Sequence, residues 1–306
     1  MFSEEIYLSY SGVIKNFGHL RALDCVDLKI RRGEIFGFIG PDGAGKTTLI
    51  RMAMGINNPD AGECMLLGSS DRSEARVHAG YVSQIFSMYT DMSVKENIDL
   101  FGSLYGTPHD VVNMRASAIL KRTGLWPFRD RFVGKLSGGM KQKLALAAGL
   151  LHTPEILFLD EPTTGVDPVA RREFWAMLYE LNHDGLTIVV STPYMDEAEL
   201  CTRKMFINGG KILDVGTSDE LTSKYDGKLL MTDFSDRRAK KWILGCEHVL
   251  DANLFGSSYH IVVDNLEEGR TSILKAAEAR NIPAITLREI KPGLEDLFVS
   301  LSGEKH

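Results

Sequence analysis

One short segment constrains the fold of this chain more than any other. Residues Gly40–Thr48 read Gly-Pro-Asp-Gly-Ala-Gly-Lys-Thr-Thr, which fits the pattern Gly-x-x-x-x-Gly-Lys-[Ser/Thr] without a mismatch. Residues 34–39, which precede it, predict a buried strand, and residues 49–54 predict a helix. This strand–loop–helix context is the one in which the pattern forms a phosphate-binding loop. The segment therefore predicts an α/β fold with a phosphate site at the start of a helix.

The residue types in this loop explain how it would hold a phosphate. Its glycines let successive backbone N–H groups turn toward an anion, and the helix N-terminus adds partial positive charge. Lys46 would reach the β- and γ-phosphates, and the Thr47 hydroxyl would ligate Mg²⁺. A glycine-rich turn without a ligand is the alternative, but a lysine buried at a tight turn needs an anion. The expected nucleotide-binding residues of the loop are Gly40, Pro41, Asp42, Gly43, Ala44, Gly45, Lys46, Thr47 and Thr48.

A pair of carboxylates follows another buried strand. The continuous apolar run Ile156–Leu159 is typical of a parallel strand that is covered on both faces, and Asp160 and Glu161 come directly after it. Ligands bind at the carboxyl ends of strands in open α/β sheets. Asp160 would hold Mg²⁺ through water, and Glu161 is the candidate general base for an attacking water. A solvated acidic turn is the alternative reading.

A third motif lies between the other two. Residues Leu136–Met140 read Leu-Ser-Gly-Gly-Met, and Ser137, Gly138 and Gly139 would open a helix as a second anion site. An ordinary N-cap with flexible glycines is the alternative. With this motif the chain resembles the ATP-binding cassette (ABC) ATPases, whose signature reads Leu-Ser-Gly-Gly-Gln. A phosphate loop alone also fits kinases and GTPases, whereas the three motifs together are close to diagnostic.

The resemblance covers residues 5 to about 215 and implies further roles. Two cassettes of the family pair head to tail, with ATP between the phosphate loop of one and the signature loop of the other. Phe17 falls where the family stacks an aromatic on adenine, although an aromatic in such a strand can also belong to the core. Asp167 falls in the loop that crosses the dimer, and Gln84 matches the glutamine that senses Mg²⁺. The implied catalytic residues are Glu161, Lys46 and Gln84, and the implied metal ligands are Thr47, Gln84 and Asp160.

The chain departs from the family pattern at two positions. Met140 replaces the signature glutamine, which is a mild change because Ser137 and the glycines carry the phosphate contacts. The family also places a histidine after the last core strand, where this chain has Pro193. Proline has no side-chain donor, so a contact to the γ-phosphate is missing and hydrolysis is expected to be weak. The Tyr194 hydroxyl could substitute for it, but a packing role is the favoured interpretation.

The pattern of the chain changes near residue 217. We expect a nucleotide-binding domain over 1–217, with a helical subdomain at about 88–152, and an accessory domain over 218–306. The fold class is thus α/β, a P-loop NTPase parallel sheet core with a helical signature subdomain, plus a small α+β domain of ferredoxin-like order β-α-β-β-α-β. The expected elements of the second domain are strands 228–233, 247–254, 257–264 and 284–290 and helices 236–245, 266–280 and 293–302.

Bulk properties limit the class of protein and its location. The net charge of −6 gives no basic field that would attract nucleic acid. The four cysteines form no Cys-x-x-Cys pair, which fits a reducing cytosol. The start of the chain, residues 1–5, is acidic where a secretory signal would be basic, and no apolar run reaches about 18 residues. We therefore expect a cytoplasmic protein whose membrane part is another chain.

The motifs together predict the ATP-binding and ATP-hydrolysing subunit of an ABC transporter. Pro292–Phe298 resembles the ending of bacterial drug and small-molecule exporter ATPases, and Ser191–Glu199 resembles the N-terminal cassette of tandem exporter ATPases. The implied cofactors are ATP and Mg²⁺. The implied partners are integral membrane permease subunits and a second ABC ATPase, with a heterodimer favoured over a homodimer, on the cytoplasmic face of the inner membrane. The alternatives are a regulatory cassette that barely hydrolyses ATP and a soluble ABC ATPase that acts outside transport.

Overall fold

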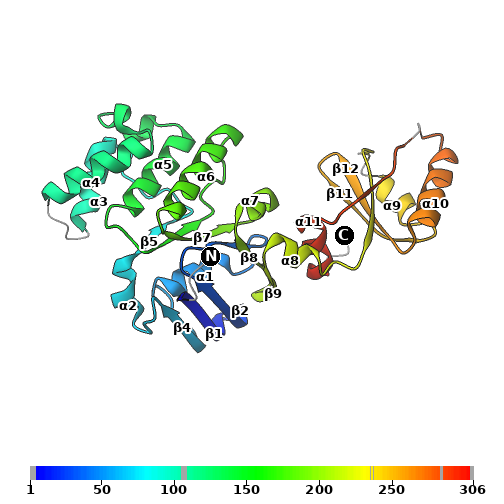
Figure 1. Ribbon diagram of the computed structural model, residues 1–306, viewed down its shortest axis with the longest axis horizontal. Helices are drawn as coiled ribbons and strands as arrows, with labels where there is room; N and C mark the ends of the chain where they lie inside the picture. Colours follow the sequence, from blue (N-terminus) through cyan, green and yellow to red (C-terminus); the bar gives the residue numbers. More distant parts are fainter. Residues whose placement is uncertain (1–4, 105–108, 235, 237, 283–284, 304–306) are drawn as a thin grey trace. The chain divides into compact units, whose positions relative to one another are not determined.

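The computed structural model describes residues 5–104, 109–234, 236, 238–282 and 285–303 (Figure 1). The chain forms two compact units, residues 1–215 and 216–306. Residues 1–4 of the acidic segment at the start of the chain lie outside the described residues. Residue 284, where the last expected strand begins, also lies outside them. No helix among the residues described is long and apolar enough to cross a bilayer.

A six-stranded sheet organises the first unit. Its order is β5 (Ala79–Val82), β6 (Ile156–Asp160), β7 (Thr187–Thr192), β3 (Ile35–Ile39), β8 (Arg203–Asn208) and β9 (Lys211–Gly216). The pairs β5–β6, β6–β7, β7–β3 and β3–β8 are parallel. All residues of β3 and β6 are buried, as expected of parallel strands covered on both faces. The predicted parallel α/β core is therefore confirmed.

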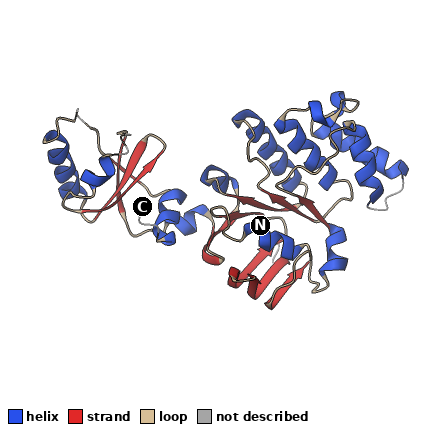
Figure 2. Cartoon of the chain, turned by 180° about the vertical axis from the view of Figure 1, so that it is seen from behind, coloured by secondary structure: helices blue, strands red, loops and turns tan. Residues whose placement is uncertain are grey.

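Different elements cover the two faces of this sheet, as Figures 1 and 2 show. One face packs against α1 (Lys46–Ala53) and an antiparallel sheet of β2 (Leu20–Arg31), β1 (Ile6–Phe17) and β4 (Ala61–Leu66). The other face packs against α5 (Gly138–Gly149) and α6 (Pro168–His183). Successive strand residues alternate between the faces, so Phe158 joins the first cluster and Leu157 and Leu159 join the second.

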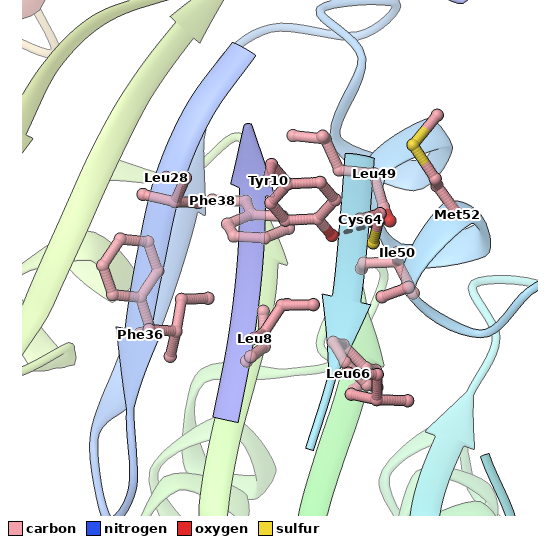
Figure 3. Packing of buried hydrophobic residues seen from close by; sticks show 14 of the residues in the cluster. Leu8, Tyr10, Leu28, Phe36, Phe38, Leu49, Ile50, Met52, Cys64 and Leu66 are labelled. Carbon is pink, nitrogen blue, oxygen red and sulfur yellow. Dashed lines mark hydrogen bonds between the residues drawn. The ribbon is translucent and has the colours of Figure 1, made fainter. Parts of the chain in front are cut away.

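The core on the α1 side is dense and largely apolar (Figure 3). Phe36 and Phe38 of β3 lie among side chains of α1 and the antiparallel sheet, and their rings meet edge to face at 5.9 Å. The Tyr10 hydroxyl, buried in this cluster, donates to the backbone oxygen of Leu49 at 2.8 Å. That bond satisfies a polar group that would otherwise be costly to bury, and it fixes α1 to the antiparallel sheet.

The helical subdomain consists of α3 (Val94–Leu104), α4 (His109–Arg122) and α5 around a cluster of its own. Ser93 and Glu96 form a capping box at the start of α3. The Ser93 backbone N–H donates to the Glu96 carboxylate at 2.7 Å, and the Glu96 N–H donates to the Ser93 hydroxyl at 3.2 Å. Short helices α2 (Arg72–Ala75) and α7 (Met195–Leu200) and strands β4, β8 and β9 complete the unit and were not anticipated from the sequence.

The second unit contains an antiparallel sheet in the order β11 (Val249–Phe255), β12 (Ser258–Val263), β10 (Lys228–Thr232) and β13 (Arg288–Ile290). Its helices are α8 (Ser218–Thr222), α9 (Ala239–Ile243), α10 (Leu266–Glu278) and α11 (Leu294–Ser302). The chain order and strand order are those of the predicted ferredoxin-like arrangement, with every neighbouring pair antiparallel. Helix α9 is shorter than the predicted helix over residues 236–245.

Candidate nucleotide-binding site

The phosphate loop leaves β3 at Ile39 and enters α1 at Lys46. Gly43 and Gly45 have φ angles of 78° and 112°, a region that side chains strongly disfavour. A Cβ at Gly40 would overlap the backbone oxygen of Ile207 in β8. The glycines of the motif are therefore required by the path of the backbone, which brings the loop to the N-terminus of α1.

The side chain of Lys46 is 3% exposed and is held by the loop itself. Its Nζ donates to the backbone oxygens of Gly40 at 2.7 Å and Pro41 at 2.9 Å. The same Nζ lies 3.5 Å from Glu161 Oε1. A buried ammonium group needs such partners to offset the cost of its burial. They also hold its charge at the mouth of the loop, where the motif predicts a bound phosphate.

Asp160 connects the loop to the neighbouring strands. Thr47 Oγ1 donates to Asp160 Oδ1 at 3.0 Å, and Ser191 Oγ donates to the same oxygen at 2.6 Å. The Tyr81 hydroxyl lies 3.4 Å from Asp160 Oδ2. A threonine hydroxyl beside a buried carboxylate is an oxygen donor set suited to Mg²⁺, so Thr47 and Asp160 fit the expected metal site.

Sequence reasoning missed Ser191 and Tyr81. Ser191 lies opposite Asp160 in the register of β6 and β7, and Tyr81 comes from β5 on the other side of β6. Burial raises the pKa of the Tyr81 hydroxyl, and the charge of Asp160 raises it further. Tyr81 therefore stays protonated near neutral pH and remains a hydrogen-bond donor. The sequence signal that could have indicated a site role for Ser191 is its position as a polar residue at the end of an apolar strand.

Glu161 lies between two of the predicted catalytic side chains. Gln84 Nε2 donates to Glu161 Oε2 at 2.9 Å, while Lys46 approaches Oε1. The Glu161 backbone has a φ of 48°, which is strained for a residue with a side chain. Its N–H is held by the Ser191 hydroxyl at 3.0 Å and by the Ser191 backbone oxygen at 3.1 Å. The structure thus places Gln84 on the candidate base, whereas its predicted role toward Mg²⁺ stays a prediction.

The signature loop belongs to the other face of the sheet. Ser137 caps α5, and its Oγ accepts the Met140 N–H at 3.3 Å. Gly138 and Gly139 form the first turn, where a Cβ at Gly139 would lie only 2.6 Å from Ala170 Cβ. Because α5 and α1 pack on opposite faces, Ser137 and the phosphate loop are carried by different layers of one chain. Sites shared between two chains, as the resemblance implies, fit this arrangement.

Three other predicted residues occupy distinct positions. Asp167 caps α6, because its Oδ1 accepts the N–H groups of the residues two and three positions further on at 3.1 and 3.0 Å. Phe17, at the end of β1, is 47% exposed, with Lys15 Nζ 5.5 Å from its ring centroid. The core alternative for Phe17 is therefore wrong, while its contact with adenine stays a prediction. Tyr194 packs under the Arg171 guanidinium, 4.9 Å from the ring centroid, in agreement with the favoured packing role.

Comparison with known proteins places these observations in a family. Residues 23–164 match the family model described as ABC transporter. The chain is 32% identical over 302 residues to the Nod factor export ATP-binding protein I of Ralstonia nicotianae, covering 97% of this chain and 94% of that relative. The chain belongs to the ABC transporter family. It is also 37% identical over 304 residues to the probable multidrug ABC transporter ATP-binding protein YbhF of Escherichia coli.

The extent of these matches differs between relatives. The alignment with YbhF covers 97% of this chain but 52% of YbhF, so the chain spans about half the length of that relative. Among solved structures, CbiO1 from Clostridium perfringens, part of the ABC transporter complex CbiONQ, has a TM-score of 0.67 at 27% identity, with 72% of this chain and 92% of that chain covered. The dimeric bacterial ABC transporter cassette MJ0796 has a TM-score of 0.62 at 26% identity, with 69% and 98% covered.

Proposed function

We propose that this chain binds Mg²⁺–ATP and hydrolyses it as the ATPase subunit of an ABC exporter, energising separate membrane permease subunits. The convergence of Lys46, Thr47, Asp160 and Glu161 at one edge of the parallel sheet carries the proposal. In-line attack on a γ-phosphate needs positioning and charge neutralisation rather than covalent chemistry, and this edge offers both. The names of the relatives, which refer to multidrug transport and Nod factor export, support an exporter.

Each residue has a role that its geometry supports. Lys46 and the loop N–H groups would hold the phosphates, and Thr47 and Asp160 would hold Mg²⁺, which neutralises phosphate charge when bound. Glu161 would orient the attacking water, and the Gln84 amide keeps one oxygen of that carboxylate in place. These roles depend on short, buried contacts, where electrostatic interactions are strong.

The second partner would be another ABC cassette. Ser137, Gly138, Gly139 and Asp167 would face the nucleotide of that cassette, because they are carried by the layer opposite α1. Pro193 favours a heterodimer, since a homodimer would contain two sites that lack a γ-phosphate contact. The complex would lie on the cytoplasmic face of the inner membrane, where it would bind the permease subunits.

The test uses the chain purified together with its membrane subunits. Glu161→Gln should keep ATP affinity within about twofold but lower the hydrolysis rate by about 100-fold or more, since it removes a base and not a binding group. Glu173→Gln is the matched control, because Glu173 is an exposed carboxylate paired with Lys143 on the helical surface. Hydrolysis by Glu161→Gln at the wild-type rate would rule out the proposed mechanism.

Two rival functions have their own readouts. A regulatory cassette would bind ATP in the wild type without measurable turnover in the complete transporter. An ABC ATPase that acts on ribosomes or DNA would sediment with those particles, whereas the proposed subunit should pellet with membranes only when its permease subunits are coexpressed.

A further inference from the structure

Helix α7 carries a carboxylate that the proposed mechanism does not use. Glu197 is 1% exposed, and its Oε1 accepts a hydrogen bond from Thr163 Oγ1, a hydroxyl that is also buried. Arg171 Nε lies 3.5 Å from the same oxygen. The other oxygen, Oε2, is buried with no hydrogen-bond partner among the residues described. Burying a carboxylate in this way is unfavourable, so stability alone does not explain the contact.

The three side chains of this cluster come from three segments around the nucleotide site. Thr163 lies in the loop between Glu161 and Asp167, which is tightened by a backbone bond from Val166 N to Thr163 O at 3.1 Å. Arg171 lies in the first turn of α6, four positions after its N-cap Asp167. Glu197 lies in α7, four positions after Pro193. One buried carboxylate therefore joins the loop after β6, the start of α6 and the segment after β7.

The first turn of α6 extends this connection in two directions. Arg171 donates to Asp196 at 3.1 Å and stacks on Tyr194, so it holds the segment after Pro193 from a second side. The neighbouring Ala170 packs against Gly139 of the signature turn, with no room for a Cβ there. A shift of the segment after β7 must therefore move the α6 turn, and the α6 turn contacts the signature helix.

We propose that Glu197 is a positioning residue that fixes the loop 163–167 and the first turn of α6 to the segment carrying Pro193. The inference rests on the proposed ATPase function, because the groups it positions are those that would face a partner's nucleotide. The contact of Glu197 with Thr163 is a buried hydrogen bond that links the loop after β6 to the segment after Pro193.

The test compares Thr163→Val with Thr163→Ser and includes Glu197→Gln. Valine matches the shape of threonine but lacks the hydroxyl, whereas serine keeps it. Glutamine at 197 keeps an acceptor for Thr163 but loses the charge that attracts Arg171. Glu173→Gln is the matched control, because Glu173 is an exposed carboxylate on the same helix as Arg171 and pairs with Lys143. If Thr163→Val does not fold, Glu197→Gln provides the answer.

Two measurements on the full chain test the proposal. In amide hydrogen exchange without nucleotide, Thr163→Val should speed exchange within residues 163–171 by about tenfold and leave α1 unchanged. With the membrane subunits present, it should lower kcat for ATP about 10- to 100-fold at a KM within about twofold, since misplaced groups cost rate more than binding. Thr163→Ser and Glu173→Gln should behave as wild type, and Glu197→Gln should show a smaller effect of the same kind.

The outcomes separate this inference from the proposed function. Unchanged exchange in residues 163–171 would overturn the positioning role whether or not the chain hydrolyses ATP. Faster exchange throughout the first unit would indicate a merely structural contact and would also overturn it. An unchanged kcat together with locally faster exchange would also overturn the positioning role, because the position of the loop would then not matter to the reaction. A wild-type complex without ATPase activity would instead reject the proposed function, while the exchange result would still decide the contact.

Discussion

The six-stranded sheet of the first unit is mainly parallel, whereas the sheet of the second unit is antiparallel, and the predicted catalytic residues lie in the first unit. In the parallel sheet of the first unit, β3, β6 and β7 all end at the same edge. That edge receives the phosphate loop, Asp160 and Ser191 together. In the second unit every neighbouring strand pair is antiparallel, so successive strand ends alternate between two edges.

Polar pairs in the second unit are correspondingly dispersed. His260 Nδ1 lies 2.7 Å from Asp296 Oδ1, while Arg288 pairs with Asp233 at 2.9 Å on an exposed surface. Neither pair brings together the set of oxygen ligands and a cation that a nucleotide phosphate needs. We therefore predict that nucleotide chemistry belongs to the first unit, and the following predictions test that division.

The largest expected effect is the loss of ATP binding in Lys46→Ala. The substitution removes the buried cation of the loop, and charge-assisted contacts with a phosphate are strong, so affinity should fall by about 100-fold. The fold should persist, because the core of α1 is formed by Leu49 and Ile50. Titration with labelled ATP measures the change, and Lys143→Ala, at an exposed ion pair, is the control. Unchanged affinity would contradict the assignment of the site.

Pro193→His should raise the hydrolysis rate. A histidine at this position would supply the missing donor to the γ-phosphate, and one such donor is typically worth about 10²- to 10³-fold in rate. Because the geometry here has not been selected for histidine, we expect about tenfold. Steady-state ATPase assays measure it, with Tyr194→Phe as a control that should change nothing if Tyr194 only packs. A wild-type chain that is already fast, with no gain in Pro193→His, would remove the argument for a heterodimer.

Ile261→Ala should destabilise the second unit without affecting the nucleotide. Ile261 is fully buried in the central strand β12, and such truncations cost about 2–5 kcal/mol of unfolding free energy. Denaturant unfolding should show the loss in the transition of the second unit, while ATP affinity stays within about twofold. A large fall in ATP affinity would show that the two units are coupled and would break the comparison.

The smallest effect is expected from removal of the second unit. A chain that ends near residue 217 retains the complete six-stranded sheet and all three motifs. It should therefore remain soluble and bind ATP within about twofold of the full chain, as measured by the same titration. Insolubility or loss of binding would show that the first unit depends on residues 218–306.

The sequence by itself determined the chemistry of the loop and the class of the fold. The phosphate motif, the carboxylates after an apolar strand and the alternation of strands and helices each depend on local order along the chain, which is readable without a structure. Local patterns did not reveal β4, β8 or β9. Gly62 breaks the strand-like sequence pattern of β4, and β8 and β9 form a hairpin at the edge of the sheet.

Only the tertiary structure decided which distant residues meet. Ser191 reaches Asp160, and Glu197 reaches Thr163, across more than 30 positions of sequence. Gln84 reaches Glu161 across 77 positions. Strand order and the packing of helices on the two faces set these contacts, and a single sequence records the periodicity of an element but not its neighbour. The roles of Phe17 toward adenine and Gln84 toward Mg²⁺ therefore stay predictions, whereas the environment of Glu161 is a property of the folded sheet.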